Sequence, residues 1–319
     1  MEHRVSIVRL LCWFVGVGLA GCVEPIPFDE PFTVGVNLPW WSYGGDVGSN
    51  AWGHFGASTR VDEVDATFAA LEQAGVGEVR WFAFGDGRAS PEFEGDRVMG
   101  LEDLAWDDFD TVFDRAAAHD VQVLVVLFDY LLCDSTSVVD GVSLGGRCAL
   151  VTNSAARRSL LDTVILPLAE TYAEHPGVAG WEVINEPEWP MRGRLGMEET
   201  GDGPMVDFVS DVAETLFLHT DAPVSVGSTD MRSVQDIWVD VPLDVVSVHW
   251  YGLTLPDPTD LPEDLPVTLG EFSADRDVDN VMGRALGAGY SGAFPWSLNA
   301  DDGHGPLDLD ELAAWMANE

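Results

Sequence analysis

Eight short apolar runs alternate with helical patterns along the 319 residues, and this alternation predicts a (β/α)8 barrel. Two further observations support that fold class. The runs are rich in Val and nearly all apolar, as in the strands of a parallel sheet that is buried on both faces. Polar and aromatic residues follow many of the runs, and no Gly-x-Gly-x-x-Gly turn follows the first. The alternative of a doubly wound open sheet is therefore disfavoured.

Each element is placed by the period of its apolar residues and by the turn residues that end it. Strands are expected at 34–38, 78–82, 121–128, 178–184, 224–227, 245–249, 267–271 and 292–296. Helices are clearest at 61–74, 101–119, 155–175, 205–219, 278–288 and 307–317. The helices after the fifth and sixth strands are weak, because 234–238 is short and 261–265 contains Pro262 and precedes Pro266. One domain over residues 34–319 fits this pattern, since such barrels routinely reach about 250 residues or more.

The first 21 residues have the pattern of an export signal. Arg4 and Arg9 precede an apolar run over 10–19 that is too short for a typical membrane-spanning helix. The run leads into Leu-Ala-Gly-Cys, ending at Cys22, which resembles a bacterial lipoprotein signal and implies lipid attachment to Cys22. An ordinary signal peptide with an incidental cysteine is the alternative. Either way we expect the mature protein outside the cytoplasm, at the cell surface or in the periplasm, with the Pro-rich, acidic residues 22–33 as an extended tether.

The composition restricts the possible partners. The formal net charge is −40 at pH 7, and all 15 basic residues are Arg. Such a surface repels nucleic acid and anionic lipid headgroups, so we expect no nucleic-acid partner and membrane contact only through the lipid anchor. An acidic coat suited to a salty habitat accounts for the charge, and an acidic groove for a cationic substrate is the alternative.

Two cysteines remain after the signal. Cys133 and Cys148 flank a polar loop, and in an oxidising compartment we expect them to form a disulfide that contributes roughly 3 kcal/mol in the chain-entropy model. Two unpaired thiols are the alternative. A zinc site is disfavoured by only two sulfurs without an adjacent His. The acidic run 275–280 lacks the turn Gly and the twelfth-position Glu of a calcium loop, so no metal or cofactor is expected.

Two of the predicted strands lead into a glutamate. The fourth continues into Asn185-Glu186-Pro187, and the seventh ends in Gly270-Glu271. A lone buried charge is costly, so two glutamates at the same end of a barrel indicate carboxylates kept for chemistry. Paired carboxylates there are typical of glycoside hydrolysis, in which one protonates the leaving oxygen and the other attacks the sugar.

Further residues complete a family pattern. The set Arg80, Asn185-Glu186-Pro187, His249-Trp250-Tyr251, Glu271 and Trp296 resembles the clan A glycoside hydrolases, most closely family 5, over about residues 34–319. The resemblance implies that Glu186 is the general acid/base and that Glu271 is the nucleophile. It implies that Asn185 binds the sugar 2-hydroxyl and that Arg80 lies beside the nucleophile.

The same resemblance implies that His249 and Tyr251 line the cleft and that Trp296 forms a platform under the sugar. Alternatives remain for these residues. Arg80 could instead form a structural salt bridge with Glu182, and His249, Tyr251 and Trp296 could be core residues.

Aromatic residues crowd the first two loops after predicted strands. Trp40 and Trp41 lie in the first loop, Asp86 lies in the second, and Trp189 directly follows the Asn-Glu-Pro motif. Because sugar rings present flat C–H faces, exposed Trp side chains near carboxylates favour stacking, and Asp86 would contact hydroxyl groups. Packing beneath the loops is the alternative for each aromatic residue.

Together these patterns predict a retaining β-glycosidase that is monomeric, needs no cofactor and acts on a β-linked glucan or mannan by double displacement. An exo-acting β-mannosidase or a transglycosylase is one alternative. A non-catalytic lipoprotein that captures oligosaccharides in the same cleft is another. The sequence does not separate glucan, mannan and xylan, because these polymers differ at one hydroxyl or hydroxymethyl group that several loops read.

Overall fold

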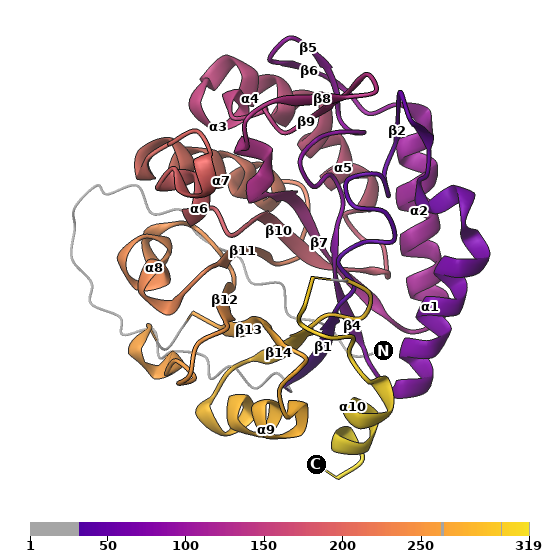
Figure 1. Cartoon of the computed structure of the whole chain (residues 1–319), viewed down its shortest axis with the longest axis vertical. Helices are drawn as coiled ribbons and strands as arrows, with labels where there is room; N and C mark the ends of the chain where they lie inside the picture. The colour runs from indigo at the N-terminus through magenta and orange to yellow at the C-terminus, as the bar shows by residue number, and fades with distance from the viewer. Residues whose placement is uncertain (1–31, 263–264, 301, 319) are drawn as a thin grey trace, which may run out of the picture.

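The computed structural model describes residues 32–262, 265–300 and 302–318. Within them, eight parallel strands close into a barrel in the order β1, β4, β7, β10, β11, β12, β13, β14 and back to β1 (Figure 1). The predicted (β/α)8 fold is confirmed. Residues 1–31, which contain the predicted signal, Cys22 and most of the predicted tether, lie outside the described residues.

The barrel strands match the predicted apolar runs to within two residues at each end. They are β1 (Thr33–Asn37), β4 (Glu78–Phe82), β7 (Gln122–Asp129), β10 (Val178–Asn185), β11 (Val224–Ser228), β12 (Val246–Trp250), β13 (Val267–Ser273) and β14 (Gly292–Trp296). Their residues are almost all buried, because side chains facing outward meet the helices and side chains facing inward fill the barrel.

The helices surround the ring of strands in Figure 1. They are α1 (Val61–Ala74), α2 (Asp103–Ala118), α3 (Ala149–Thr152), α4 (Ser154–Leu160), α5 (Leu166–Tyr172), α6 (Glu188–Met191), α7 (Asp202–Phe217), α8 (Met231–Asp236), α9 (Val278–Ala288) and α10 (Leu309–Met316). The helix predicted at 155–175 is α4 and α5 joined by a π-helical turn, Leu161–Ile165. The weak helix predicted at 234–238 begins three residues earlier as α8. At 261–265 the prediction is not tested fully, because 263–264 lie outside the described residues; a 3-10 turn at Pro258–Asp260 precedes them.

Short hairpins in the loops after the first three barrel strands were not predicted. They pair β2 (Ser49–Asn50) with β3 (Gly53–His54), β5 (Glu92–Glu94) with β6 (Arg97–Gly100), and β8 (Ser137–Val139) with β9 (Val142–Leu144). Figure 1 shows the second and third hairpins toward α4, at one side of the ring of strands. The first and third are joined by the Trp52 indole N–H, which donates to the Val139 carbonyl at 3.0 Å.

The predicted disulfide between Cys133 and Cys148 is present, with Cα atoms 4.4 Å apart. It closes the loop that carries the third hairpin. Among the described residues, no helix has both the length and the apolar character needed to cross a membrane.

Candidate active site

Arg80 occupies the centre of the barrel, fully buried, where it joins four strands. Its Nη1 lies 2.7 Å from Glu271 Oε1 and 2.9 Å from Asn37 Oδ1. Its Nη2 lies 2.5 Å from Glu182 Oε1 and 2.8 Å from Asn185 Oδ1. The predicted contact with Glu271 and the alternative ion pair with Glu182 therefore both exist. A guanidinium presents five N–H donors, which allows one buried cation to hold this whole set.

A glycine makes room for this network. Gly227, on β11, faces the Arg80 and Glu182 pair, and a Cβ atom there would lie 2.5 Å from Glu182 Oε1 and 3.0 Å from Arg80 Nη2. Any larger residue would push the ion pair apart, so the close approach of the β11 backbone requires glycine.

Glu271 lies within β13, and both of its oxygens have hydrogen-bond donors. Oε1 accepts from Arg80, and Oε2 accepts from the Tyr251 hydroxyl at 2.9 Å. His249 Nδ1 stands 3.5 Å from Oε2. The carboxylate is 4% exposed, so it depends on these donors rather than on bulk water.

Glu186 directly follows β10 and has a left-handed backbone, with φ 48°. Its N–H donates to the Gly227 carbonyl at 2.7 Å, which fixes that conformation. The Trp189 indole N–H donates to Glu186 Oε2 at 2.7 Å, and His249 Nδ1 lies 3.0 Å from Oε1. A non-glycine residue in this region of backbone space is often part of a functional site.

The two glutamates face each other across His249. One donor atom from each of Glu186, His249 and Glu271 lies within 4.8 Å of the other two. Retaining glycosidases hold their carboxyl groups about 5 to 5.5 Å apart, whereas inverting enzymes need roughly 6.5 to 9.5 Å to admit a water. The spacing here fits double displacement.

The surroundings divide the two carboxyl groups into different roles. Burial raises the pKa of Glu186 and of Glu271. Burial also lowers the pKa of His249 to about 4, so this ring is neutral near pH 7 and Arg80 is the permanent cation in contact with Glu271. Among the described residues, no arginine contacts Glu186. We infer that Glu271 is the carboxylate and that Glu186 holds the proton.

Asp129, at the end of β7, was missed by the sequence analysis. The Asn185 amide donates to Asp129 Oδ1 at 3.0 Å, and the Tyr43 hydroxyl donates to Oδ2 at 2.7 Å. Burial raises the pKa of Asp129 to about 6. Its sequence position carried the signal, since Asp129 ends an apolar strand just as Glu271 does.

Glu188 was also missed, although it lies two residues beyond Glu186. It is 1% exposed and accepts from the Ser228 hydroxyl at 2.7 Å, the Thr229 N–H at 3.0 Å and the Trp238 indole at 2.7 Å. These bonds tie the turn after Glu186 to the end of β11.

Trp296 and Trp40 lie together at the end of β14. Their ring centroids are 6.0 Å apart in an edge-to-face arrangement, and both rings pack on Phe82. The Trp296 indole donates to Asp302 at 2.6 Å. Trp296 is 7% exposed, so little of the predicted platform is open in this structure.

Two predicted substrate contacts are not brought to the glutamates. Trp41 packs on Phe68 and Trp81, and its indole donates to Thr67 of α1 at 3.3 Å, so its ring belongs to the layer between barrel and helix. Asp86 is 3% exposed and forms a two-point ion pair with Arg88 at 2.8 and 2.9 Å. The aromatic and acidic composition of these loops does not distinguish side chains that point outward from those that point back into the fold.

Within the described residues, Glu186, His249 and Glu271 are also the one group of His, Cys and carboxylate side chains close enough to hold a metal ion. Arg80 and Tyr251 already occupy both oxygens of Glu271. His249 Nδ1 contacts Glu186, whereas His249 Nε2 is buried and has no hydrogen-bond partner among the described residues.

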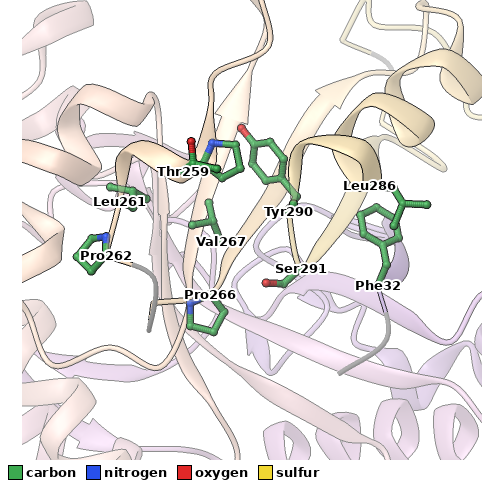
Figure 2. A pocket seen from close by; sticks show the side chains of 11 residues that line it. Phe32, Thr259, Leu261, Pro262, Pro266, Val267, Leu286, Tyr290 and Ser291 are labelled. Carbon is green, nitrogen blue, oxygen red and sulfur yellow. The ribbon is translucent and has the colours of Figure 1, made fainter. Parts of the chain in front are cut away.

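A separate cavity lies at the other end of the barrel. Figure 2 shows Tyr290 and Val267 facing the same space, with Pro266 and Ser291 where β13 and β14 begin. The glutamates lie at the opposite ends of the strands. Among the described residues, its lining contains Thr259, Tyr290 and Ser291 but no carboxylate or His, which separates this cavity from the candidate active site.

No protein-family model matches the chain. Two curated relatives were found by sequence. A mannan endo-1,4-β-mannosidase of Mytilus edulis is 25% identical over 55% of this chain, and the match spans 44% of that protein's length. A mannan endo-1,4-β-mannosidase of Cryptopygus antarcticus is 22% identical over 85% of this chain and 81% of its own length.

Solved structures give a longer match. An endo-1,4-β-mannanase of Eisenia fetida aligns with a TM-score of 0.73 at 19% identity, covering 90% of each chain. A glycoside hydrolase family 5 mannosidase of Rhizomucor miehei aligns with a TM-score of 0.59 at 14% identity, covering 91% of this chain and 94% of its own. At these identities the likeness concerns the fold, and the fold is the single-domain (β/α)8 barrel found in these glycoside hydrolases.

Proposed function

We propose that this protein is a retaining β-mannanase, similar to the family 5 glycoside hydrolases, that cleaves O-glycosidic bonds of a β-linked mannan. One observation carries the proposal: Glu186 and Glu271 approach each other within 4.8 Å, and of these two glutamates only Glu271 contacts Arg80. That asymmetry supplies an acid and a nucleophile at the spacing that double displacement needs. The two mannan endo-1,4-β-mannosidases support mannan over glucan and internal over terminal cleavage.

The first step forms a glycosyl ester. A Glu271 oxygen attacks the anomeric carbon as the bond to the leaving oxygen breaks, and the Glu186 proton goes to that oxygen. In the second step Glu186 takes a proton from water, the water oxygen attacks the same carbon, and Glu271 leaves as a carboxylate. Asn185, held by Arg80 and Asp129, keeps one N–H free for a sugar hydroxyl.

The experiment compares the purified mature domain with Glu271→Ala on galactomannan, glucomannan, β-glucan and xylan, at low and high salt. Reducing ends measure cleavage, and product size separates internal from terminal attack. We expect release from the mannans that vanishes in the variant. Binding to a polymer without any release would contradict the proposal and support the capture lipoprotein.

We also propose that the protein is exported and anchored through lipid on Cys22. The Leu-Ala-Gly-Cys motif supports this proposal, as does the disulfide, which persists in oxidising compartments. After expression in a bacterium, the protein is expected in the membrane fraction with a lipid-modified N-terminal Cys22. A Cys22→Ala variant that fractionates and migrates like the wild type would argue against the anchor.

A further inference from the structure

We propose that Trp189 is a positioning residue that determines which oxygen of Glu186 carries the catalytic proton. The inference rests on the proposed function, in which Glu186 is the acid/base, and it assigns Trp189 a role other than a stacking surface for sugar.

The chain returns to Glu186 within one turn. Pro187 continues from Glu186 in helical backbone, and the Trp189 N–H meets the Glu186 carbonyl at 3.2 Å as α6 begins. This turn brings the indole Nε1 to 2.7 Å from Glu186 Oε2. The three donors around the buried Glu188 carboxylate hold the turn against β11. The short indole contact is therefore built into the fold rather than made by a free surface side chain.

An indole N–H can only donate, so Glu186 Oε2 must accept and cannot also direct a proton at Trp189. Of the two oxygens of a neutral carboxyl, the carbonyl oxygen is the stronger acceptor, so the indole bond favours the state with the proton on Oε1. Oε1 lies 3.0 Å from His249 Nδ1, and the same nitrogen lies 3.5 Å from Glu271 Oε2. The proton is thus held on the side that faces the nucleophile, where the glycosidic bond must lie.

The same bond serves the second step. When Glu186 has lost its proton, Trp189 continues to donate to Oε2 and stabilises the charge there. Trp189 does not bond Oε1, which lies 3.0 Å from His249 Nδ1, so Oε1 accepts the proton from water and serves in both steps. This arrangement keeps the proton transfers in both steps at one place in the cleft.

Trp189→Phe tests the role because it keeps an aromatic ring and removes only the donor. The first readout is the Glu186 pKa, measured by NMR titration of protein carrying ¹³C-labelled glutamate carboxyls, with Glu186→Gln to assign the signal. A donor to the charged form lowers the pKa, so its loss raises the pKa. We expect a rise of about one unit, comparable to one hydrogen bond to a charged group. Trp52→Phe is the matched control, since it removes an indole N–H bond at a distant hairpin and is expected to leave this pKa unchanged.

The second readout is kinetic. The alkaline limb of kcat/KM should move upward by the same amount, because activity needs Glu186 protonated. Mannan cleavage should fall about tenfold, in keeping with a misplaced general acid. Cleavage of a dinitrophenyl β-mannoside should stay within about twofold, since its leaving group needs no proton.

An unchanged Glu186 pKa in Trp189→Phe would overturn the proposal. An equal rise in KM for both substrates, with the alkaline limb of kcat/KM unmoved, would overturn it too, because that is the result expected of a stacking surface. If the phenylalanine variant fails to fold, Trp189→Leu removes the same donor and is expected to give the same pKa rise. The NMR titration needs no turnover. A wild-type protein that cleaves no mannan would therefore count against the proposed function while the titration still decided the role of Trp189.

Discussion

The ends of β10 and β13 carry the same side chain in different surroundings. Glu271 accepts from a buried guanidinium and a tyrosine hydroxyl, at 2.7 and 2.9 Å. Glu186 accepts from an indole N–H and lies beside a His ring that burial keeps neutral, with its pKa lowered to about 4. The Glu271 side chain is 6% exposed and the Glu186 side chain 16%, so most of the difference between them comes from their partners. On the proposed mechanism, the contact with Arg80 favours the anion at Glu271, and the lack of such a contact favours the proton on Glu186.

The largest effects should come from removing either carboxyl. Glu271→Ala is expected to reduce cleavage of mannan and of a dinitrophenyl β-mannoside alike, by at least ~10⁴-fold, because no nucleophile remains. Glu186→Ala is expected to lose ~10² to 10⁴-fold on mannan but far less on the activated substrate. Steady-state kinetics with azide added checks this, since the Glu186 variant should give a mannosyl azide of retained configuration, whereas any azide product of the Glu271 variant should be inverted. Rescue of the Glu271 variant alone, with a mannosyl azide of retained configuration, would exchange the two roles.

Removing the cation should cost stability as well as activity. Arg80→Met leaves Glu182 and Glu271 buried without their partner, so we expect the free energy of unfolding to fall by about 3 to 5 kcal/mol. Urea unfolding measures this, with Arg232→Met as control. Arg232 is exposed and pairs with Asp236 on α8, where a change within about 1 kcal/mol is expected. Equal losses in both variants would show that Arg80 is not the centre of the network.

Tyr251→Phe removes a hydrogen bond from Glu271 and should move the acid limb of the pH profile. Trp189→Phe, in contrast, should move the alkaline limb. The Tyr251 hydroxyl stabilises the Glu271 anion, so Tyr251→Phe raises the pKa of Glu271. Activity requires that anion, and the acid limb of kcat/KM is expected to shift upward by about one unit. The alkaline limb should stay in place. Movement of the alkaline limb instead would mean that Tyr251 acts on the proton donor.

The smallest effect on activity is expected at Trp41, which was predicted to contact substrate but packs away from the glutamates in the structure. Trp41→Phe keeps a ring against Phe68 and Trp81 and loses the bond to Thr67. We expect kcat/KM on mannan within about twofold of the wild type and a loss of about 1 kcal/mol in unfolding free energy. A large rise in KM with the free energy of unfolding unchanged would show that Trp41 contacts substrate in the cleft.

Much of the fold could be predicted because each strand of a buried parallel barrel is a separate apolar run in the sequence. Glu78–Phe82 and Gly292–Trp296 were found to the residue. The hairpins could not be predicted in the same way, since two- and three-residue strands such as Ser49–Asn50 are too short to show a period.

The site was predicted where a residue's function depends on its place at a strand end. Glu186 and Glu271 follow from that rule, and Asp129 obeys it too, whereas Arg80 lies in the middle of β4 and was expected from the family resemblance. The directions of loop side chains could not be predicted, because Trp41 and Asp86 are turned inward by partners far away in the sequence, Thr67 of α1 for the indole and the Gly145 N–H for the carboxylate. The contact between Trp189 and Glu186 depends on a single tight turn, which the spacing alone does not reveal.

The central claim is that Glu271 becomes bonded to the sugar while Glu186 does not. The most direct measurement is mass spectrometry of the protein after incubation with 2-deoxy-2-fluoro-β-mannosyl fluoride, which slows release of a glycosyl ester. We predict one added sugar, on the peptide that contains Glu271, and none in Glu271→Ala. An adduct on Glu186, or mannan cleavage with inverted configuration and no adduct, would contradict the account.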